Sequence, residues 1–202
     1  KVETQQVCDD LADEGFSAVA LHGDLEQRDR ERTLIHFANK SASILVATDV
    51  AARGLDIDDM DMVINYHLAH DPQTHVHRVG RTGRAGKKGI ACSIYGEAEQ
   101  FKVAQIGDHY ERDFTPEPMP SYNLLDKPPY KPEMVTLMID AGKKQKVRAG
   151  DILGALTGKD GVAGRQVGKI NVLDNVAFVA VKRNSSMPEL RKLTEGNIKG
   201  RK

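Results

Sequence analysis

The chain has 202 residues, of which 29 are Lys or Arg and 29 are Asp or Glu, so its formal net charge is zero. That length is enough for one or two domains with a hydrophobic core, and no apolar run approaches the roughly 20 residues of a membrane span. Only Cys8 and Cys92 are present, which excludes a disulfide framework and favours a reducing compartment, so we expect a cytoplasmic protein. The chain begins at Lys1 within a helical pattern, and we expect it to be part of a longer protein.

The zero net charge conceals a division of the chain. Residues 1–118 hold 13 Lys or Arg and 21 Asp or Glu, a net charge of −8, whereas residues 119–202 hold 16 and 8, a net charge of +8. This asymmetry indicates two modules, the second with an anionic partner such as nucleic acid. Six of the eight prolines lie in residues 115–132. We therefore predict a first domain at 1–114, an extended linker at 115–132 and a second domain at 133–202.

Hydrophobic periodicity predicts alternating helices and strands in the first domain. We expect helices over 3–14, 25–38, from 72 onward and over 97–110, and strands over 16–21, 44–47, 62–66 and 89–94, with 44–47 and 62–66 buried. Asp24 and Asp71 are candidate N-caps, and Pro72 suits a first helical position. This alternation is typical of βαβ units and predicts an α/β fold whose parallel sheet is flanked by helices. In such sheets ligands bind at the carboxyl ends of the strands.

The second domain has a different predicted order. We expect strands over 134–140, 167–173 and 176–182, a tight turn at Asp174 and Asn175, and helices over 150–157 and 187–195. The order β-α-β-β-α is that of a small α+β ferredoxin-like domain without its last strand. The chain ends about where that strand would begin, so we expect this domain to be incomplete.

An arginine cluster dominates the chemistry of the first domain. Residues 75–86 contain Arg78, Arg81 and Arg84 at three-residue spacing, with glycines between them and no acid. At helical pitch this spacing would place the guanidinium groups on one face, where they would repel one another unless an anion completed the site. A planar guanidinium fits phosphate oxygens well. Three glycines weaken a helix by about 1 kcal/mol each, which favours close approach to a ligand or another domain over a basic surface helix paired to acids.

Two further stretches place polar residues near the predicted strand ends. Residues 47–56 follow a strand and would bring Thr48, Asp49, Arg53, Gly54 and Asp56 to the rim of the sheet. Residues 22–30 set Gln27 and Arg30 one helical turn apart. Either stretch alone fits an ordinary loop or helix start. Four histidines between residues 67 and 77 lack the spacing and cysteine partners of a structural zinc site, so we expect no metal site there.

Together, the three stretches are similar to the second RecA-like domain of the DEAD-box ATP-dependent RNA helicases over residues 1–112. They resemble that family's His-Gly and Gln-x-x-Arg motif, motif V and motif VI, His-Arg-x-Gly-Arg-x-Gly-Arg. The resemblance implies that Arg84 is the arginine finger, that Arg81 faces the γ-phosphate beside it and that Asp56 contacts the ATP ribose. It also implies RNA-backbone contacts from Arg30, Thr48 and Gly54, and interdomain roles for His77, Arg78, Arg53 and Gln27.

The same resemblance implies ATP with Mg²⁺ as cofactor, held mainly by an N-terminal RecA-like domain. The chain contains no P-loop sequence and no Asp-Glu-Ala-Asp sequence; residues 154–160 imitate a P-loop but fit a helix end capped by Gly158. We therefore predict an enzyme of the ATP-hydrolysing RNA helicase class whose fragment is inactive by itself.

The second domain resembles the RNA-binding domain of the DbpA-like subgroup of DEAD-box proteins, a divergent RRM, over residues 134–202. Residues 143–148, 149–157, 167–172 and 198–202 carry this resemblance. It implies binding to a hairpin of large-subunit ribosomal RNA and a role in ribosome assembly. Of the aromatic side chains that stack bases in ordinary RRMs, only Phe178 remains, so charge must supply most of the affinity. The candidate RNA-binding cations are Lys143, Lys144, Lys146, Arg148, Lys169, Lys182, Arg183, Lys199, Arg201 and Lys202.

The leading interpretation is the C-terminal part of an ATP-dependent helicase that remodels structured RNA, with a basic module that targets it. One alternative is a non-catalytic RNA-binding adaptor, although an adaptor has no need for the motif VI arginines. Another is a different superfamily-2 helicase that acts on DNA. The sequence of residues 48–56 and the RRM-like domain both argue against this alternative.

Overall fold

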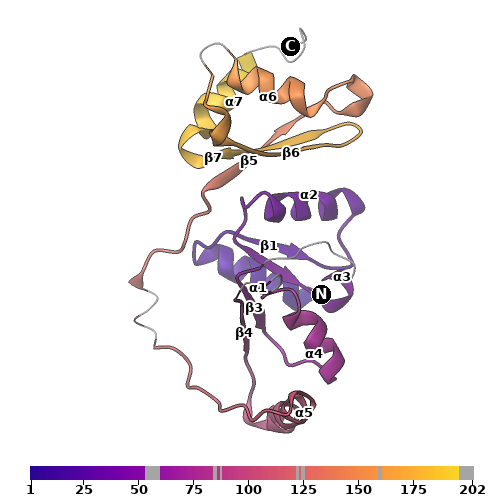
Figure 1. The fold of residues 1–202 in the computed structure, drawn as a ribbon, viewed down its shortest axis with the longest axis vertical. Coiled ribbons are helices and arrows are strands. Elements are labelled where there is room, and N and C mark those ends of the chain that lie inside the picture. Colours follow the sequence, from indigo (N-terminus) through magenta and orange to yellow (C-terminus); the bar gives the residue numbers. More distant parts are fainter. Residues whose placement is uncertain are drawn as a thin grey trace. The chain divides into compact units, whose positions relative to one another are not determined.

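The fold is described from a computed structural model, shown in Figure 1. The structure describes residues 1–52, 60–83, 86, 88–121, 123, 126–158 and 161–195. The chain divides into two compact units, one formed by Lys1–Ala52 and Pro128–Lys202 and the other by Arg53–Lys127. None of the described helices is long and apolar enough to cross a membrane.

The first unit begins with a parallel pair of strands covered by helices. β1 (Ala18–Leu21) pairs with β2 (Ile44–Ala47) in parallel, and the helices α1 (Val2–Asp13) and α2 (Gln27–Ala38) contact these strands. Leu21, the last residue of β1, is fully buried. The short helix α3 (Asp49–Ala52) follows directly after β2.

The start of α2 differs from its prediction. The helix begins at Gln27 with Glu26 at the N-cap position, and neither residue 24 nor 26 caps it through a side chain. Asp24 instead accepts a hydrogen bond from Lys1 Nζ at 2.7 Å. A carboxylate two residues before the N-cap is too early to reach the first free amides, which is why the predicted cap at Asp24 is wrong.

The same unit contains a three-stranded antiparallel sheet. Its order is β5 (Met134–Ile139), β7 (Ala177–Lys182) and β6 (Val167–Val172), so β7 is the central strand. The helices α6 (Ala149–Thr157) and α7 (Ser186–Glu195) contact the strands from one side (Figure 1). The core between these helices and the sheet contains Leu137, Val147, Ile152, Leu156, Ala177, Val179 and Val181.

The turn between β6 and β7 is the tight hairpin that the sequence predicts. The amide of Leu173 donates to the carbonyl oxygen of Val176 at 2.9 Å, which leaves Asp174 and Asn175 as the two loop residues. The observed order β-α-β-β-α confirms the α+β ferredoxin-like class. Residues 196–202, which precede the point where a last strand would begin, lie outside the described part of the chain.

The opposite face of this sheet is also covered in part. Thr136 Oγ1 accepts from Asn39 Nδ2 at 3.3 Å and lies 2.6 Å from Ser41 Oγ, just beyond the end of α2. The ring of Phe178 meets the ring of His36 edge to face, with centroids 6.4 Å apart. Phe178 is 3% exposed, so the aromatic side chain that the sequence offered for base stacking is not available for it.

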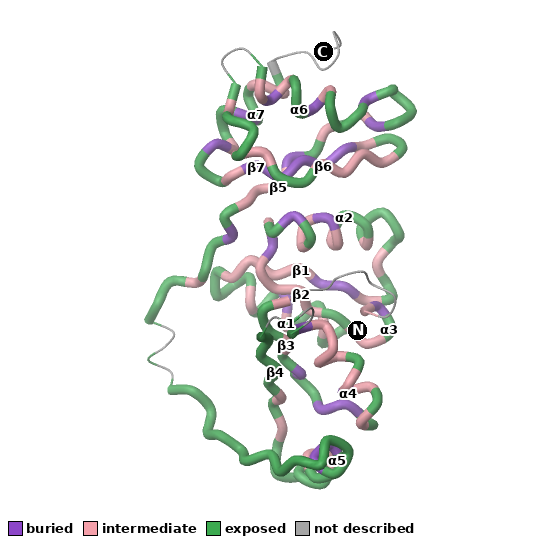
Figure 2. Tube along the Cα trace, viewed as in Figure 1, coloured by how far each residue is buried: buried purple, intermediate pink, exposed green. Residues whose placement is uncertain are grey.

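The second unit contains another parallel pair. β3 (Met62–Asn65) pairs with β4 (Ile90–Ser93), and the helix α4 (Pro72–Val79) lies between them in the sequence. The 3₁₀ turn η1 (Glu97–Glu99) leads into α5 (Gln100–Tyr110). No described residue between α5 and β5 belongs to an α-helix or strand, and Figure 2 shows the segment after α5 as mostly exposed.

The burial predicted for β3 is wrong. Met62 and Ile64 are 45% and 59% exposed, and their register partners Ile90 and Cys92 are exposed as well. These four side chains share one face by the alternation of the strands. In the described part of this unit the sheet has only two strands, and such a pair does not provide the cover that a central strand needs.

Candidate nucleotide and RNA interface

The arginine-rich segment leaves the helix earlier than its spacing suggests. Asp71 caps α4 by accepting from the Thr74 amide at 2.8 Å, and Pro72 occupies the first turn, as the sequence predicts. The helix then ends at Val79, with Gly80 as its C-cap. Arg81 therefore lies in the turn beyond the helix. The prediction that the arginines share one helical face is wrong for Arg78 and Arg81.

Glycines follow the end of this helix. Gly80, the C-cap, has a φ angle of −62°, whereas Gly83 and Gly86 have positive φ angles of 68° and 78°. Left-handed backbone at these two later positions suits glycine and keeps the segment beyond Arg81 out of a helix. Arg84 and the motif V residues Arg53, Gly54 and Asp56 lie outside the described residues.

Arg78 is bound to the end of strand β3. Its Nη1 donates to Asn65 Oδ1 at 3.1 Å and to the carbonyl oxygen of His67 at 2.7 Å. Asn65 is 2% exposed, and its Nδ2 donates to Ser93 Oγ at 3.1 Å and to the carbonyl oxygen of Cys92 at 3.4 Å. This network joins β3, β4 and the last turn of α4. The interdomain roles inferred for Arg78 and for His77, which is exposed on α4, stay predictions.

The turn after α4 has a second anchor. The amide of Met60 donates to the carbonyl oxygen of Arg81 at 3.3 Å, and the Thr82 hydroxyl donates to the carbonyl oxygen of Met60. Thr82 is 9% exposed. A Cβ on Gly89 would lie 2.1 Å from Thr82 Oγ1, so glycine is required where this chain passes the turn. The backbone on either side of Arg81 is therefore held by two sets of bonds.

His75 occupies the inner side of α4. It is 8% exposed and meets Tyr110 edge to face, with ring centroids 6.0 Å apart. Burial lowers the pKa of His75, and the charge of Arg78 adds to this effect. The ring is therefore neutral near pH 7, which is compatible with its place between α4 and α5. Among the described residues no three potential ligands gather into a metal site.

Two of the predicted RNA contacts meet at helix α3. Arg30 Nη2 donates to the carbonyl oxygen of Ala51 at 2.7 Å, and the Ala51 amide donates to Thr48 Oγ1 at 3.3 Å. Arg30 and Thr48 are thus brought together by one residue at the carboxyl end of β2, where ligands bind in parallel sheets. Gln27 is exposed and donates to Glu31 Oε1 at 3.1 Å, so it lies apart from this pair.

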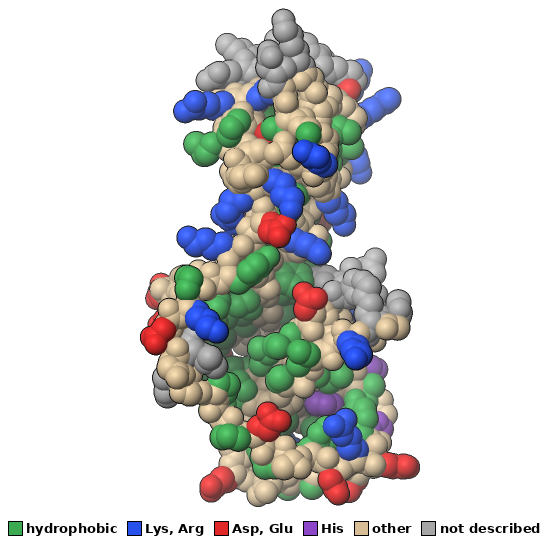
Figure 3. All heavy atoms as spheres, turned by 60° about the vertical axis from the view of Figure 1, so that its left-hand side comes forward, with side chains coloured by type: hydrophobic (Ala, Val, Ile, Leu, Met, Phe, Trp, Pro, Cys, Tyr) green, Lys and Arg blue, Asp and Glu red, His purple; other side chains and the backbone are tan. Residues whose placement is uncertain are grey.

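A basic surface covers the loop before α6. Lys143, Lys144, Lys146 and Arg148 are all exposed, and a pocket of about 290 Å³ is lined by Lys143, Lys146, Val147 and Arg148. The amides of Lys143 and Lys144 donate to the carbonyl oxygens of Leu173 and Asp174 at 2.8 and 2.9 Å. These bonds fix the loop to the β6–β7 hairpin. Figure 3 shows many Lys and Arg side chains over the part of the molecule that holds this sheet.

The loop geometry includes one backbone feature that the sequence did not indicate. Lys146 has a φ angle of 61°, in the left-handed region. The Arg148 amide then donates to Asp151 Oδ2 at 2.9 Å at the start of α6. The basic side chains therefore project from a loop whose backbone is bonded at both ends.

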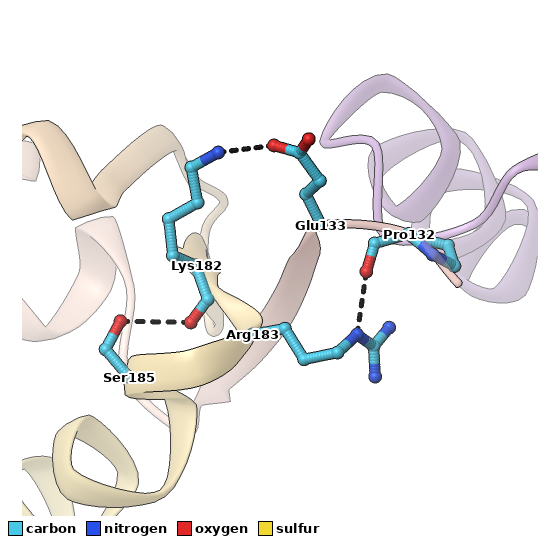
Figure 4. A network of polar contacts seen from close by, with 5 residues as sticks. All are labelled: Pro132, Glu133, Lys182, Arg183 and Ser185. Carbon is cyan, nitrogen blue, oxygen red and sulfur yellow. Dashed lines mark hydrogen bonds and ion pairs between the residues drawn. The ribbon is translucent and has the colours of Figure 1, made fainter. Parts of the chain in front are cut away.

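The remaining cations differ in their surroundings. Lys169 is exposed on β6. Lys182 pairs with Glu133 at 2.5 Å, and Arg183 Nε donates to the carbonyl oxygen of Pro132 at 2.7 Å, which fastens the end of β7 to the start of β5 (Figure 4). The hydrogen bond from Lys182 holds the pKa of the Glu133 carboxyl below its ordinary value. Arg201, Lys199 and Lys202 lie outside the described residues.

Comparison with known proteins places both parts of the chain in one family. Residues 1–86 match the model of the helicase conserved C-terminal domain, and residues 136–202 match that of the DbpA RNA-binding domain. The ATP-dependent RNA helicase DbpA of Escherichia coli strain K12 is 47% identical over 201 residues, which is 100% of this chain and 44% of that protein. The chain belongs to the DbpA-like DEAD-box helicases. It spans less than half the length of this curated relative.

Solved structures of DEAD-box proteins confirm the RecA-like fold of the first part. A DEAD box protein from the hyperthermophile Methanococcus jannaschii has a TM-score of 0.53 and 46% identity, over 56% of this chain and 31% of that chain. A variant of S. cerevisiae Dbp5 bound to RNA and ADP BeF3 has a TM-score of 0.51 and 35% identity, over 55% of this chain and 30% of that chain. This chain is thus a DbpA-like helicase C-terminal region with an RNA-binding domain.

Some residues of the interface have no clear signal in the sequence. We call residues 80–83, which follow α4, the arginine-rich turn. Its surroundings include Asn65, Thr82 and Gly89, yet each of these is a common residue at a strand end or in a loop. The only sign in the sequence that Thr82 and Gly89 support this turn is that they lie within or beside the glycine-rich stretch.

Proposed function

We propose that this chain supplies the arginine finger and half of the RNA site of an ATP-dependent DEAD-box RNA helicase. The observation that carries the proposal is the anchored turn after α4, with Arg78 bonded to the end of β3 and the Arg81 backbone bonded to Met60. Phosphoryl transfer depends on positioned charge, and a finger arginine is worth about 10³- to 10⁵-fold in rate. A rigid backbone beside Arg81 and ahead of Arg84 suits that requirement.

The nucleotide is ATP with Mg²⁺, which an N-terminal RecA-like domain of the longer protein would mainly hold. Arg84 and Arg81 would stabilise charge on the transferred phosphoryl group, and Asp56 would contact the ribose. The donor chemistry fits, because guanidinium groups bind phosphate oxygens by paired hydrogen bonds. The sequence contains neither a P-loop nor Asp-Glu-Ala-Asp, so we propose that this chain does not hydrolyse ATP by itself.

RNA would bind at two places on this chain. Arg30 and Thr48, with Gly54, would contact the phosphate backbone beside α3. The basic surface at Lys143 to Arg148 would bind a structured hairpin of large-subunit ribosomal RNA, which the enzyme would remodel during ribosome assembly in the cytoplasm. The exposure of these cations and the match to the DbpA RNA-binding domain support this partner.

The catalytic part is tested by RNA-stimulated ATP hydrolysis in the full-length protein. We expect Arg84→Ala to lower kcat by about 10³-fold or more. Arg28→Ala, on the exposed side of α2, is the matched control and should have no effect. Unchanged turnover in Arg84→Ala would remove the arginine finger, and an absence of turnover in the wild-type full-length protein would favour the non-catalytic adaptor. The isolated chain should show no turnover at all.

The RNA partner is tested by titrating the chain with a hairpin from the peptidyl-transferase region of large-subunit ribosomal RNA. A hairpin of the same length with a scrambled loop is the control. Binding to the first and at least about tenfold weaker binding to the second, at one stated salt concentration, is the expected result. Equal affinity for both hairpins would leave a non-specific RNA-binding surface in place of the proposed target.

A further inference from the structure

Asn65 is a buried polar side chain whose hydrogen-bonding groups are directed to both sides. Its Oδ1 accepts from Arg78 Nη1 at 3.1 Å, and its Nδ2 donates to Ser93 Oγ at 3.1 Å and to the Cys92 carbonyl oxygen at 3.4 Å. A buried amide of this kind costs free energy unless it is bonded, so these bonds define one orientation of the side chain. That orientation links strand β4 to the guanidinium of Arg78.

The hydrogen bond between Asn65 and Arg78 affects the arginine-rich turn because Arg78 lies directly before that turn. Arg78 is in the last turn of α4, and the amide of Arg81 donates to its carbonyl oxygen at 3.2 Å. Arg78 also donates to the His67 carbonyl oxygen at 2.7 Å, so the end of β3 receives two bonds from one guanidinium. The second anchor, between Met60 and residues 81–82, holds the other side of the turn.

We infer that Asn65 is a positioning residue for the arginine-rich turn, because it fixes Arg78 and thereby the direction in which the chain leaves α4. This inference rests on the proposed function, since it states that a residue outside the arginine motif positions the proposed catalytic arginines. Asn65 itself does not touch the nucleotide in this assignment. A misplacement of about 1 Å in a catalytic group costs about 10²-fold in rate, so a small change at this amide is sufficient to be measured.

The choice of an amide at this position has a chemical reason. One end must accept from a cation and the other must donate to a carbonyl oxygen and a hydroxyl, and the side-chain amide of Asn offers these two functions on separate atoms. Aspartate keeps the acceptor toward Arg78 but loses the donor toward β4. Leucine has the same branching at Cγ and loses both functions.

The test uses RNA-stimulated ATP hydrolysis by the full-length protein with Asn65→Leu, Asn65→Ser and Asn65→Asp. We expect Asn65→Leu and Asn65→Ser to lower kcat by about 10- to 100-fold with KM for ATP nearly unchanged, because the lost interaction acts in the transition state. Asn65→Asp keeps the acceptor for Arg78 and should retain kcat within about threefold. Ser is small and polar, so this variant remains informative if the leucine variant fails to fold.

A merely structural role for Asn65 predicts a different result. All three substitutions would then lower the melting temperature, while kcat per folded molecule would stay at the wild-type value. That result, or an equal loss of kcat in Asn65→Asp and Asn65→Leu, would overturn the inference. Arg84→Ala measured in parallel separates the two proposals: if it abolishes turnover while Asn65→Leu and Asn65→Ser do not lower it, only the positioning role fails.

Discussion

The guanidinium of Arg30 and the backbone of Ala51 are joined by a hydrogen bond of 2.7 Å. This bond links the first turn of α2 to the helix that follows β2, and it holds the side chain beside Thr48. Because an arginine that is already oriented loses less entropy when it binds a phosphate, the bond prepares Arg30 for the RNA contact that we propose.

Replacement of Arg30 tests this preparation. We expect Arg30→Gln to lower the free energy of unfolding by about 1 kcal/mol. We also expect RNA affinity to fall by about fivefold in the full-length protein, which corresponds to about 1 kcal/mol. Urea unfolding and RNA titration measure the two effects. Arg28→Gln, an exposed change on the same helix, should alter neither quantity, and equal effects in both variants would argue against a specific role for Arg30.

Substitutions at Lys146 can separate the effect of its backbone strain on stability from the effect of its charge on RNA binding. Its φ angle is 61°, and the exposed Lys40 has a φ angle of 56°, so glycine relieves the same strain at both positions. Each Lys→Gly change should raise the free energy of unfolding by up to about 1 kcal/mol. Only Lys146→Gly should weaken RNA binding and reduce the slope of log K against log salt by about 1. A similar loss of RNA affinity in Lys40→Gly would show that the basic surface at residues 143–148 is not the relevant one.

Glu189 provides a prediction for pH dependence. It is 1% exposed, and neither carboxyl oxygen has a hydrogen-bond partner among the described residues. Burial raises the pKa of Glu189; the Ser185 hydroxyl opposes this shift, but it donates to the Lys182 carbonyl oxygen at 3.0 Å, so burial dominates. The folded state therefore binds the proton more tightly than the unfolded state does.

The sign of this effect follows from linkage. The contribution of Glu189 to stability is full below the ordinary pKa of a glutamate and is lost as pH rises through the raised folded pKa. We expect Glu189→Gln to be more stable than the wild type at pH 7 and the difference to shrink toward pH 4, as measured by urea unfolding at each pH. Glu133→Gln is the control with the opposite sign, because the pKa of Glu133 is lowered by Lys182. A difference that did not vary with pH would contradict the assignment.

Gly89 tests the close approach beside the arginine-rich turn. A Cβ there would lie 2.1 Å from Thr82 Oγ1 and 2.4 Å from the Gly83 amide nitrogen, whereas a Cβ on Gly96 would meet nothing within 4 Å. We expect Gly89→Ala to lower the free energy of unfolding by about 1–3 kcal/mol and Gly96→Ala to change it little. Chemical unfolding measures both, and a neutral Gly89→Ala would show that the turn is free to shift.

Local signals in the sequence were enough to place most of the secondary structure. A short apolar run located β2, and turn and capping residues located the hairpin at Asp174 and Asn175 and the capped start of α4 at Asp71 and Pro72. These features depend on residues within a few positions of one another. For the same reason the motif spacings were sufficient to indicate the family and both kinds of domain.

The sequence was less informative wherever distant residues decide the outcome. The exposure of Met62 depends on which strands stand beside β3, and the pairing of Lys182 with Glu133 joins residues 49 positions apart. The spacing of the arginines suggested a continuous helix, but Gly80 ends it because local backbone freedom outweighs that periodicity. The role that we infer for Asn65 depends on the register of β3 with β4 and on the bond from Arg78, neither of which is visible in the sequence.

The contact between the end of α2 and the face of the three-stranded sheet has a consequence for the history of the family. Thr136 meets Asn39 and Ser41, and Phe178 meets His36, so residues between 95 and 142 positions apart are in contact. A substitution on one side of this contact without a compensating substitution on the other side would create a gap or a clash. We therefore expect paired substitutions at these positions across related genomes, so that the helicase C-terminal domain and the RNA-binding domain are inherited as a matched set.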